Sequence, residues 1–218
     1  SGWIQVGIDA SGLEARLLAN RMAKWDDGEY GKVVVHGDIH QTNMEATGIE
    51  DRDKVKTFFY GFIYGAGDAK VGKIIDRDAS AGRRLKEQFL TSMPALKKLI
   101  ENVKFQVAKK NTITLLDNRE VPCRSDHKAL NVQIQGDGAI LMKLAQCILF
   151  RNLKKMYNNR FAFMATVHDE WQIECEPGIA EDVGQMGIDA IIESGERLGC
   201  LVPMDGEYKI GRNWSECH

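Results

Sequence analysis

The sequence predicts an α+β fold in which a small antiparallel sheet is backed by helices. Short β-rich segments lie at the start, near the middle and towards the end of the chain, and the residues between them show helical periodicity. The order strand, helices, hairpin, helix, hairpin, helix, strand differs from the regular alternation of a parallel α/β sheet. With 218 residues, 44% of them hydrophobic, the chain can bury a core in one domain or two small subdomains.

The first strand is predicted in the segment WIQVGID. Ile4, Val6 and Ile8 alternate with small or more polar residues, which is typical of a half-buried strand, and the strand ends in Asp9. The next segment, ASGLEARLLANRMAKW, has leucines at helical spacing, with Ser11 as the candidate N-cap. We therefore expect a carboxylate where the strand gives way to a helix.

The middle of the chain predicts helices and one hairpin. Residues 26–31 (DDGEYG) have turn composition, and a helix follows from Asp51 to about Gly65. Residues 79–110 are helical and basic, with Pro94 starting a new helix. Residues 112–125 predict a hairpin around Asp117-Asn118.

The remaining segments complete the expected order. Residues 127–157 predict a long helix interrupted at 136–138 (GDG), because each interior Gly costs about 1 kcal/mol relative to Ala. FMATVHDEWQIEC, residues 163–175, predicts a hairpin with His168-Asp169-Glu170 at its tip. An amphipathic helix within residues 176–199 and a short strand or two end the chain.

The net charge of −2 conceals an uneven distribution. Residues 52–110 contain 14 Lys and Arg against 6 Asp and Glu, whereas residues 161–218 contain 3 basic and 12 acidic residues. This asymmetry favours one region that meets phosphates and another that holds cations.

The composition of the chain also indicates the cellular compartment in which we expect the protein. No apolar run approaches the roughly 18 residues of a membrane span. Five widely spaced cysteines indicate reduced thiols in the cytoplasm. The chain starts at Ser1 without Met or a basic leader, so we expect part of a longer cytoplasmic protein.

Asp9 and Asp169 form the first candidate site. An Asp after a strand is usually a turn former or helix cap. On adjacent strands of one sheet, however, the two would face each other and bridge divalent cations. Two such ions about 3.5–4 Å apart promote phosphoryl transfer.

The second candidate site comprises Arg52, Lys56, Tyr60 and Tyr64. Each lies four residues from the next, so all four share one helical stripe. Two cations followed by two aromatics suit a ligand with phosphates and a flat base. A helix with a basic end and two core aromatics explains the pattern equally well. Glu14, about one turn past Asp9, is either a capping-box residue or a pocket wall.

Three segments carry a resemblance to a known family. GIDASGLEARLLA, RDKVKTFFYGFIYGAG and VHDEWQI resemble motifs A, B and C of the family A (DNA polymerase I type) DNA polymerases, in the same order. GDIHQTN and RSDHKALNVQIQGDGAI also match, and WDDGEY and GRNWSECH are most like the polymerases of short-tailed phages. The resemblance covers essentially the whole chain.

The resemblance implies a right-hand polymerase palm with a helical fingers subdomain: palm at 1–35 and 116–218, and fingers at 36–115. It implies template-directed DNA synthesis with two Mg²⁺ ions, primer-template DNA and dNTPs, in the host cytoplasm if the chain is phage-encoded. The expected metal ligands are Asp9, Asp169 and the carbonyl of Ala10. Glu170 is an expected auxiliary carboxylate near the primer end.

Further site residues follow only from the resemblance. Arg52, Lys56 and His40 would contact the triphosphate, and Lys56 would donate a proton to pyrophosphate. Tyr60 would lie against sugar and base, while Glu14 and Tyr64 would exclude a ribose 2′-OH. The expected DNA contacts are Arg16, Asn131, Gln135 and His168. Position 127 is His, where many relatives have Arg.

The family's thumb and exonuclease domains normally precede motif A, and we expect neither here. The chain is then either an excised part of a polymerase or one half of a split enzyme whose partner chain supplies them. Two alternatives remain open: a nucleic-acid-binding fragment that is inactive without its missing part, and a two-metal phosphohydrolase.

Overall fold

The computed structural model describes residues 2–217 and divides into two compact units. The sheet unit comprises residues 1–17 and 136–218, and the helical unit comprises residues 18–135. Ser1, which carried the expectation about the chain's start, and His218, the last residue of the phage-like ending, lie outside the described residues. The predicted palm and fingers boundaries at 35/36 and 115/116 differ from these divisions, and the assignment of the units as palm and fingers stays a prediction.

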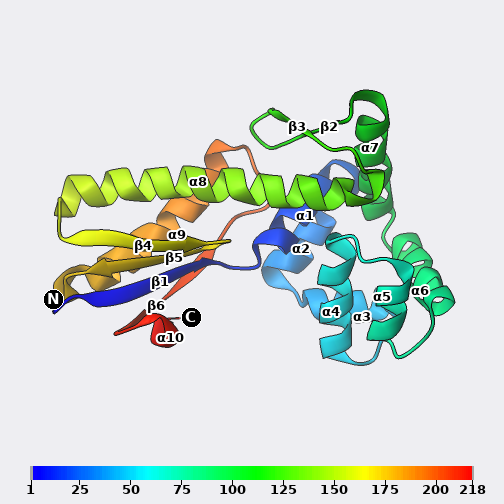
Figure 1. Cartoon of the computed structure of the whole chain (residues 1–218), viewed down its shortest axis with the longest axis horizontal. Coiled ribbons are helices and arrows are strands. Elements are labelled where there is room, and N and C mark those ends of the chain that lie inside the picture. The colour runs from blue at the N-terminus through cyan, green and yellow to red at the C-terminus, as the bar shows by residue number, and fades with distance from the viewer. Residues whose placement is uncertain (1, 218) are drawn as a thin grey trace. The chain divides into compact units, whose positions relative to one another are not determined.

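The sheet unit contains four antiparallel strands in the order β4-β5-β1-β6 (Figure 1). Its elements are β1 (Ile4–Ala10), the start of α1 (Leu13–Asp26), most of α8 (Ala129–Tyr157), β4 (Phe161–Val167), β5 (Glu170–Cys175), η2 (Pro177–Ile179), α9 (Ala180–Arg197), β6 (Gly206–Gly211) and α10 (Trp214–Cys217). The α+β class with an antiparallel sheet backed by helices is confirmed. The end of the chain forms one strand and a short helix.

Strand β1 lies in the interior of the sheet and is covered on both faces. Val6 and Ile8 are fully buried on one face, where α9 packs against β1. Gly7 points to the opposite face. A Cβ there would lie 2.4 Å from the carbonyl oxygen of Cys217 in α10. The half-buried strand expected from alternation was therefore wrong, because small Gly7 leaves room for a second covering layer.

Glycines also allow α9 to approach the sheet closely. A Cβ on Gly187 would lie 2.5 Å from the Ile8 side chain, and one on Gly184 would lie 2.4 Å from the Tyr208 ring. Tyr208 cannot withdraw freely, since its hydroxyl donates to Glu181 at 2.6 Å. The helix thus packs directly against β1, the strand that carries Asp9.

The predicted hairpin is confirmed as β4 and β5, joined by a two-residue turn at His168 and Asp169. His168 has a φ of 54°, in the left-handed region. A register shift between Phe163 and Ala165 marks a bulge in β4. The hairpin therefore presents Asp169 at its tip.

Helix α8 is continuous from Ala129 to Tyr157, so the predicted interruption at residues 136–138 was wrong. Packing explains why glycine is used there. A Cβ on Gly138 would lie 3.3 Å from the Leu13 side chain and 3.6 Å from that of Leu17. Close contact with α1 offsets the intrinsic cost of glycine in a helix.

The helical unit is built largely from short helices. Its elements are the remainder of α1, α2 (Glu29–His36), α3 (Ile39–Thr47), α4 (Arg52–Ile63), α5 (Asp68–Ile74), α6 (Ala79–Ser92), α7 (Pro94–Lys110), β2 (Thr112–Thr114), β3 (Glu120–Pro122), η1 (Asp126–Lys128) and the start of α8. The helix capped by Asp51, the break at Pro94 and the hairpin are confirmed. Helices α2, α3 and α5 were not predicted, and α2 begins within the expected turn at 26–31.

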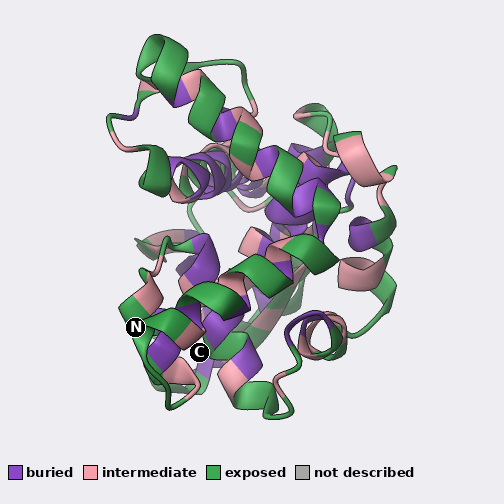
Figure 2. Ribbon diagram, turned by 90° about the vertical axis from the view of Figure 1, so that its right-hand side faces the viewer, coloured by how far each residue is buried: buried purple, intermediate pink, exposed green. Residues whose placement is uncertain are grey.

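Phenylalanines form the core beneath α4. The Phe89 ring of α6 meets Phe58 and Phe62 of α4 edge-on, with centroids 5.2 and 5.3 Å apart. Buried and exposed residues alternate around the helices (Figure 2). Of residues 2–217, none belongs to a helix long and apolar enough to cross a membrane.

The substitution Gly184→Ala should destabilise the sheet unit. The new methyl would meet the tethered Tyr208 ring, and overpacking of this kind costs about 1–3 kcal/mol. Chemical denaturation would measure the free energy of unfolding. Gly178→Ala is the matched control, because a Cβ there meets no atom within 4 Å. Equal stability of the two variants would contradict the close packing of α9.

Candidate active site

Strand pairing brings three carboxylates into a row across the sheet. Asp9 on β1 pairs with Glu170 on β5 and with Glu207 on β6. Residues directly opposite each other in an antiparallel sheet point to the same face. Like charges so placed repel each other, so this row favours a bound cation.

The backbone ties Asp169 to the end of the same strand. The amide of Ala10 donates to the carbonyl oxygen of Asp169 at 3.1 Å. Asp9 and Asp169 thus lie at the ends of neighbouring strands, the arrangement under which two carboxylates can share metal ions. Glu14, in the first turn of α1, is half-buried.

The surroundings of Asp169 raise the pKa of its carboxyl above the ordinary value. Burial raises the pKa of its carboxyl, and the negative charges of Glu14 and Glu170 also raise it. A hydrogen bond from its own backbone amide and the nearby His168 oppose this rise without cancelling it. A cation at this edge would reverse the effect, because it stabilises the carboxylate. Within residues 2–217, no three His, Cys, Asp or Glu side chains converge as ready metal ligands. A metal here would therefore need backbone oxygen or substrate atoms as well.

Glu170 is held from inside the protein. It is 5% exposed and accepts hydrogen bonds from Gln172 Nε2 and, at 3.2 Å, from Trp214 Nε1 of α10. Gln172 accepts in turn from Gln5 Nε2 at 2.6 Å. A small cavity of about 130 Å³ adjoins the carboxylate row, lined by Gly7, Asp9, Glu170, Glu207, Tyr208, Lys209 and Cys217.

Arg16 has an internal role in the structure. Its Nε donates to the carbonyl of Ser11 at 2.8 Å, and one terminal nitrogen donates to that of Pro203 at 2.6 Å. A longer contact of 3.6 Å reaches Asp205. The guanidinium thus fastens the start of α1 to the loop before β6. Its expected contact with the primer side stays a prediction.

The predicted stripe lies on the outward face of α4. Arg52 and Lys56 are exposed, Tyr60 is half-buried, and Tyr64, which caps the helix C-terminus, is 46% exposed. The inward face instead carries Val55, Phe58, Phe59, Phe62 and Ile63. Tyr64 is therefore not a core residue, and the stripe remains accessible to a ligand.

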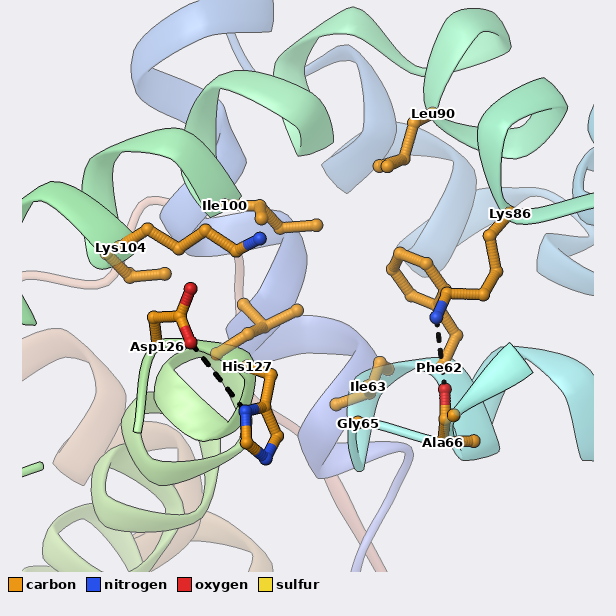
Figure 3. Close-up of a pocket in the computed structure, with 13 residues that line it drawn as sticks. Phe62, Ile63, Gly65, Ala66, Lys86, Leu90, Ile100, Lys104, Asp126 and His127 are labelled. Carbon is orange, nitrogen blue, oxygen red and sulfur yellow. Dashed lines mark hydrogen bonds and ion pairs between the residues drawn. The ribbon is translucent and has the colours of Figure 1, made fainter. Parts of the chain in front are cut away.

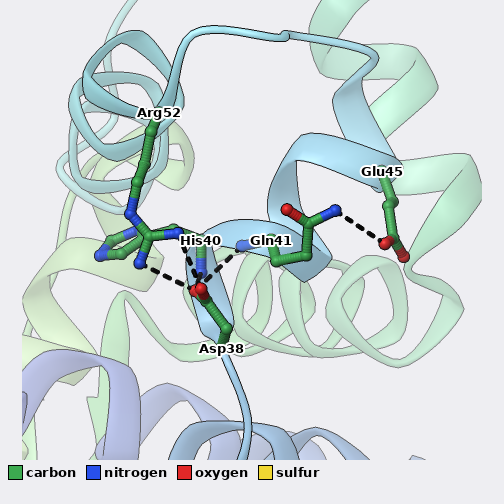
Figure 4. A network of polar contacts seen from close by, with 5 residues as sticks. All are labelled: Asp38, His40, Gln41, Glu45 and Arg52. Carbon is green, nitrogen blue, oxygen red and sulfur yellow. Dashed lines mark hydrogen bonds and ion pairs between the residues drawn. The ribbon is translucent and has the colours of Figure 1, made fainter.

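Asp38 joins two of the expected phosphate-binding residues (Figure 4). Its carboxylate accepts from both terminal nitrogens of Arg52, at 2.7 and 3.0 Å. It also caps α3 by accepting from the backbone amides of His40 and Gln41 at 2.9 and 3.1 Å. The Arg52 hydrogen bond, reinforced by these amides, lowers the pKa of Asp38 to about 2.

His40 lies in a cationic environment. Burial lowers the pKa of its imidazole, and nearby Arg52 and Lys56 lower it further, while Asp38 opposes them. Its neutral form is therefore favoured more than that of a free histidine. Its Nδ1 is buried without a hydrogen-bond partner among the residues that the structure describes. Arg52, Lys56 and His40 together form a surface suited to an anion.

The expected DNA-contacting residues are dispersed. Asn131 and Gln135 lie four residues apart on α8, so they share one face of the helix. Gln135 is exposed, whereas the side-chain oxygen of Asn131 is buried without a described partner. His168 is exposed at the hairpin tip. Their contacts with DNA stay predictions.

Outside these groups, the helical unit also contains an apolar cavity of about 290 Å³ (Figure 3). Its walls include Phe62, Ile63, Leu90, Ile100 and Val103, and His127 lies at its edge. None of the residues predicted to bind nucleotide lines it.

Sequence reasoning missed three participants. Asp38, in the segment GDIH, immediately precedes a helix, and Asp is one of the residues preferred at an N-cap. This preference could have identified Asp38 from the sequence. Glu207 and Trp214 lie in the last strand and helix without a local pattern. Only strand register and long-range hydrogen bonding reveal these two.

Comparison with known proteins shows the family. The model of "DNA polymerase family A" matches residues 1–216. The chain therefore belongs to the family A DNA polymerases.

Among curated proteins it is 39% identical to the DNA-directed DNA polymerases of Enterobacteria phage T3 and Escherichia phage T7, over 99% of this chain. It spans 34% of the length of each, or about a third.

A solved structure has the same fold. The POL domain of Pol1 from M. smegmatis, in complex with DNA primer-template and dNTP, matches with a TM-score of 0.86 and 20% identity. The match covers 100% of this chain and 41% of that one. The similarity confirms the architecture over the whole chain.

Asp169→Asn should increase stability at neutral pH in metal-free buffer. The folded-state pKa of Asp169 is raised, so the folded protein binds more protons than the unfolded chain between the two pKa values. Stability is therefore lost as pH rises from 3.8 through the folded pKa. The uncharged side-chain amide of the variant removes this loss of stability. Chemical denaturation at several pH values, in buffer with EDTA, would measure the difference in the free energy of unfolding. Asp189→Asn, at an exposed position of α9, is the control. A less stable Asp169→Asn variant at pH 7 would contradict the argument.

Proposed function

We propose that this chain carries out template-directed DNA synthesis, transferring deoxynucleotides from dNTPs to a primer 3′-OH. The observation that carries the proposal is the placement of Asp9 and Asp169 at the ends of paired strands. Membership of family A supports it. The reaction would take place in the cytoplasm, that of the host if the chain is phage-encoded.

Asp9, Asp169 and the Ala10 carbonyl would hold two Mg²⁺ ions. The donor set suits this metal, because carboxylate and carbonyl oxygens are the ligands that hard cations prefer. Burial first, and then the charges of Glu14 and Glu170, raise the pKa of Asp169, and a bound cation would offset both effects. When bound, the ions would increase the acidity of the primer hydroxyl and offset the charge of the phosphates. Glu170, fixed by Gln172 and Trp214, would support the primer end.

The helical unit would supply the nucleotide contacts. Arg52, Lys56 and His40 would bind the triphosphate, and charge neutralisation there would favour departure of pyrophosphate. Lys56, exposed one turn beyond Arg52, would donate the proton to that leaving group. Tyr60 would lie against the sugar and base.

Two further groups concern selectivity and DNA. Glu14, helped by Tyr64, would exclude a ribose 2′-OH and so favour deoxynucleotides. Asn131, Gln135, Arg16 and His168 would contact primer-template DNA, the ligand named for the M. smegmatis structure. Residues 1–35 and 116–218 would then act as palm, and residues 36–115 as fingers.

A second candidate function is nucleotide and DNA binding without independent catalysis. It is favoured by one observation: the chain spans about a third of the phage relatives. A thumb-containing segment or partner chain would then be needed for activity. The phosphohydrolase alternative is disfavoured by the accessible tyrosines beyond Arg52 and Lys56, because hydrolysis needs no platform for a base.

Primer extension with Mg²⁺, four dNTPs and the purified chain tests the proposal. Asp169→Ala should reduce extension at least about a thousandfold, since loss of a metal ligand removes several kcal/mol of transition-state stabilisation. Asp189→Ala, a distant exposed carboxylate, should extend normally. Full activity of Asp169→Ala would refute the metal assignment. Absence of extension by the folded wild-type chain would favour the binding-only alternative.

Tyr60→Phe should increase discrimination against dideoxynucleotides. The half-buried hydroxyl of Tyr60 is expected to meet the sugar, so its removal would weaken acceptance of a substrate that lacks the 3′-OH. Termination ratios in competitive extension would measure the change. The prediction fails if Tyr60→Phe and the wild-type chain give the same ratios.

A further inference from the structure

Asp38 occupies a junction between the two helices that carry the expected triphosphate contacts. Helices α3 and α4 pack together, and the Asp38 carboxylate reaches both. On α3 it accepts from the amide of His40, and on α4 it accepts from Arg52 in a two-point fork (Figure 4).

The carboxylate is fixed independently of Arg52. As the N-cap of α3 it is held by two backbone amides, at 2.9 and 3.1 Å, which do not depend on the ion pair. Arg52, by contrast, is a long side chain that is 54% exposed. Without a partner it would lose much rotational freedom on binding an anion.

We propose that Asp38 is a positioning residue, which orients the Arg52 guanidinium beside His40 before a nucleotide triphosphate binds. The fork engages one edge of the guanidinium, and a guanidinium has five N–H donors, so donors remain for phosphate oxygens. Lys56 lies one turn further along the same face of α4. The ligand class is a polyphosphate, and the inference rests on the proposed function.

The opposite role makes an opposite prediction. If the Asp38 carboxylate instead competed with phosphates for Arg52, a ligand would have to displace that carboxylate. Removal of the Asp38 charge would then strengthen nucleotide binding. If Asp38 positions Arg52, its removal weakens binding. The sign of the change therefore separates the two roles.

The test uses Asp38→Asn in the full chain. Asn caps helices about as well as Asp, so α3 is retained while the charged fork is lost. The dissociation constant for dATP with Mg²⁺, measured by calorimetry, and the KM for dNTP in primer extension should rise about two- to tenfold. This fold-change corresponds to the free energy of ordering one long side chain on binding. The kcat should change little, a split that a general loss of folding would not produce.

Asp51→Asn is the matched control. Asp51 caps α4 immediately before Arg52, accepting from the amides of Asp53 and Lys54 at 2.9 and 3.1 Å. This variant removes the same charge and retains the same kind of cap without breaking the fork. Its dATP affinity and KM should match those of the wild type, and both variants should unfold at similar denaturant concentrations.

The outcomes separate the inference from the proposed function. Equal or tighter dATP binding by Asp38→Asn, in a chain that binds nucleotide and extends primers, overturns the positioning role alone. A wild-type chain that binds no dATP and extends no primer overturns the proposed function and this inference together. Weakened binding in both variants would show a general effect of charge, which also contradicts the proposal.

Discussion

The pairing of β1 with β5 is the constraint on which the sheet unit's site depends. The register sets Asp9 opposite Glu170, and the bond from the Ala10 amide to the Asp169 carbonyl holds the hairpin tip at the end of β1. A slip of one residue would turn Asp9 to the other face. Glycines allow close packing that favours this register. Gly7 allows α10 to approach one face of the sheet, and Gly184 and Gly187 allow α9 to approach the other. Packing on both faces therefore fixes where the carboxylates lie.

Electrostatics distinguish the two units. In the sheet unit, burial and then the neighbouring negative charges of Glu14 and Glu170 raise the pKa of Asp169, and a bound cation would offset both effects. The helical unit presents Arg52, Lys56 and His40, whose pKa is lowered by burial and by the two cations, with Asp38 as a fixed counter-charge. An acidic region for metal and a basic region for phosphates are the two requirements of phosphoryl transfer. The charge asymmetry along the sequence thus corresponds to a division between the units.

The sequence predicted the features that depend on local pattern. The first strand, the Asp51 cap, the helix start at Pro94 and the turn at His168-Asp169 all form where the sequence predicts them. Features that depend on partners distant in the chain were missed or misread. The continuity of α8 through Gly138 requires knowledge of Leu13, and the second covered face of β1 requires knowledge of Cys217. Glu207 and Trp214 likewise join the site only through register and tertiary contact.

The central claim is that Asp9 and Asp169 together hold the catalytic metals. A crystal structure of the chain with primer-template DNA, a dideoxy-terminated primer, dNTP and Mn²⁺ would test it most directly, because anomalous scattering locates Mn²⁺ without reference to the surrounding atoms. The account predicts two peaks about 3.5–4 Å apart, coordinated by both carboxylates and the Ala10 carbonyl. Ordered DNA and nucleotide with no Mn²⁺ at these residues, or with Mn²⁺ held elsewhere in the chain, would contradict it.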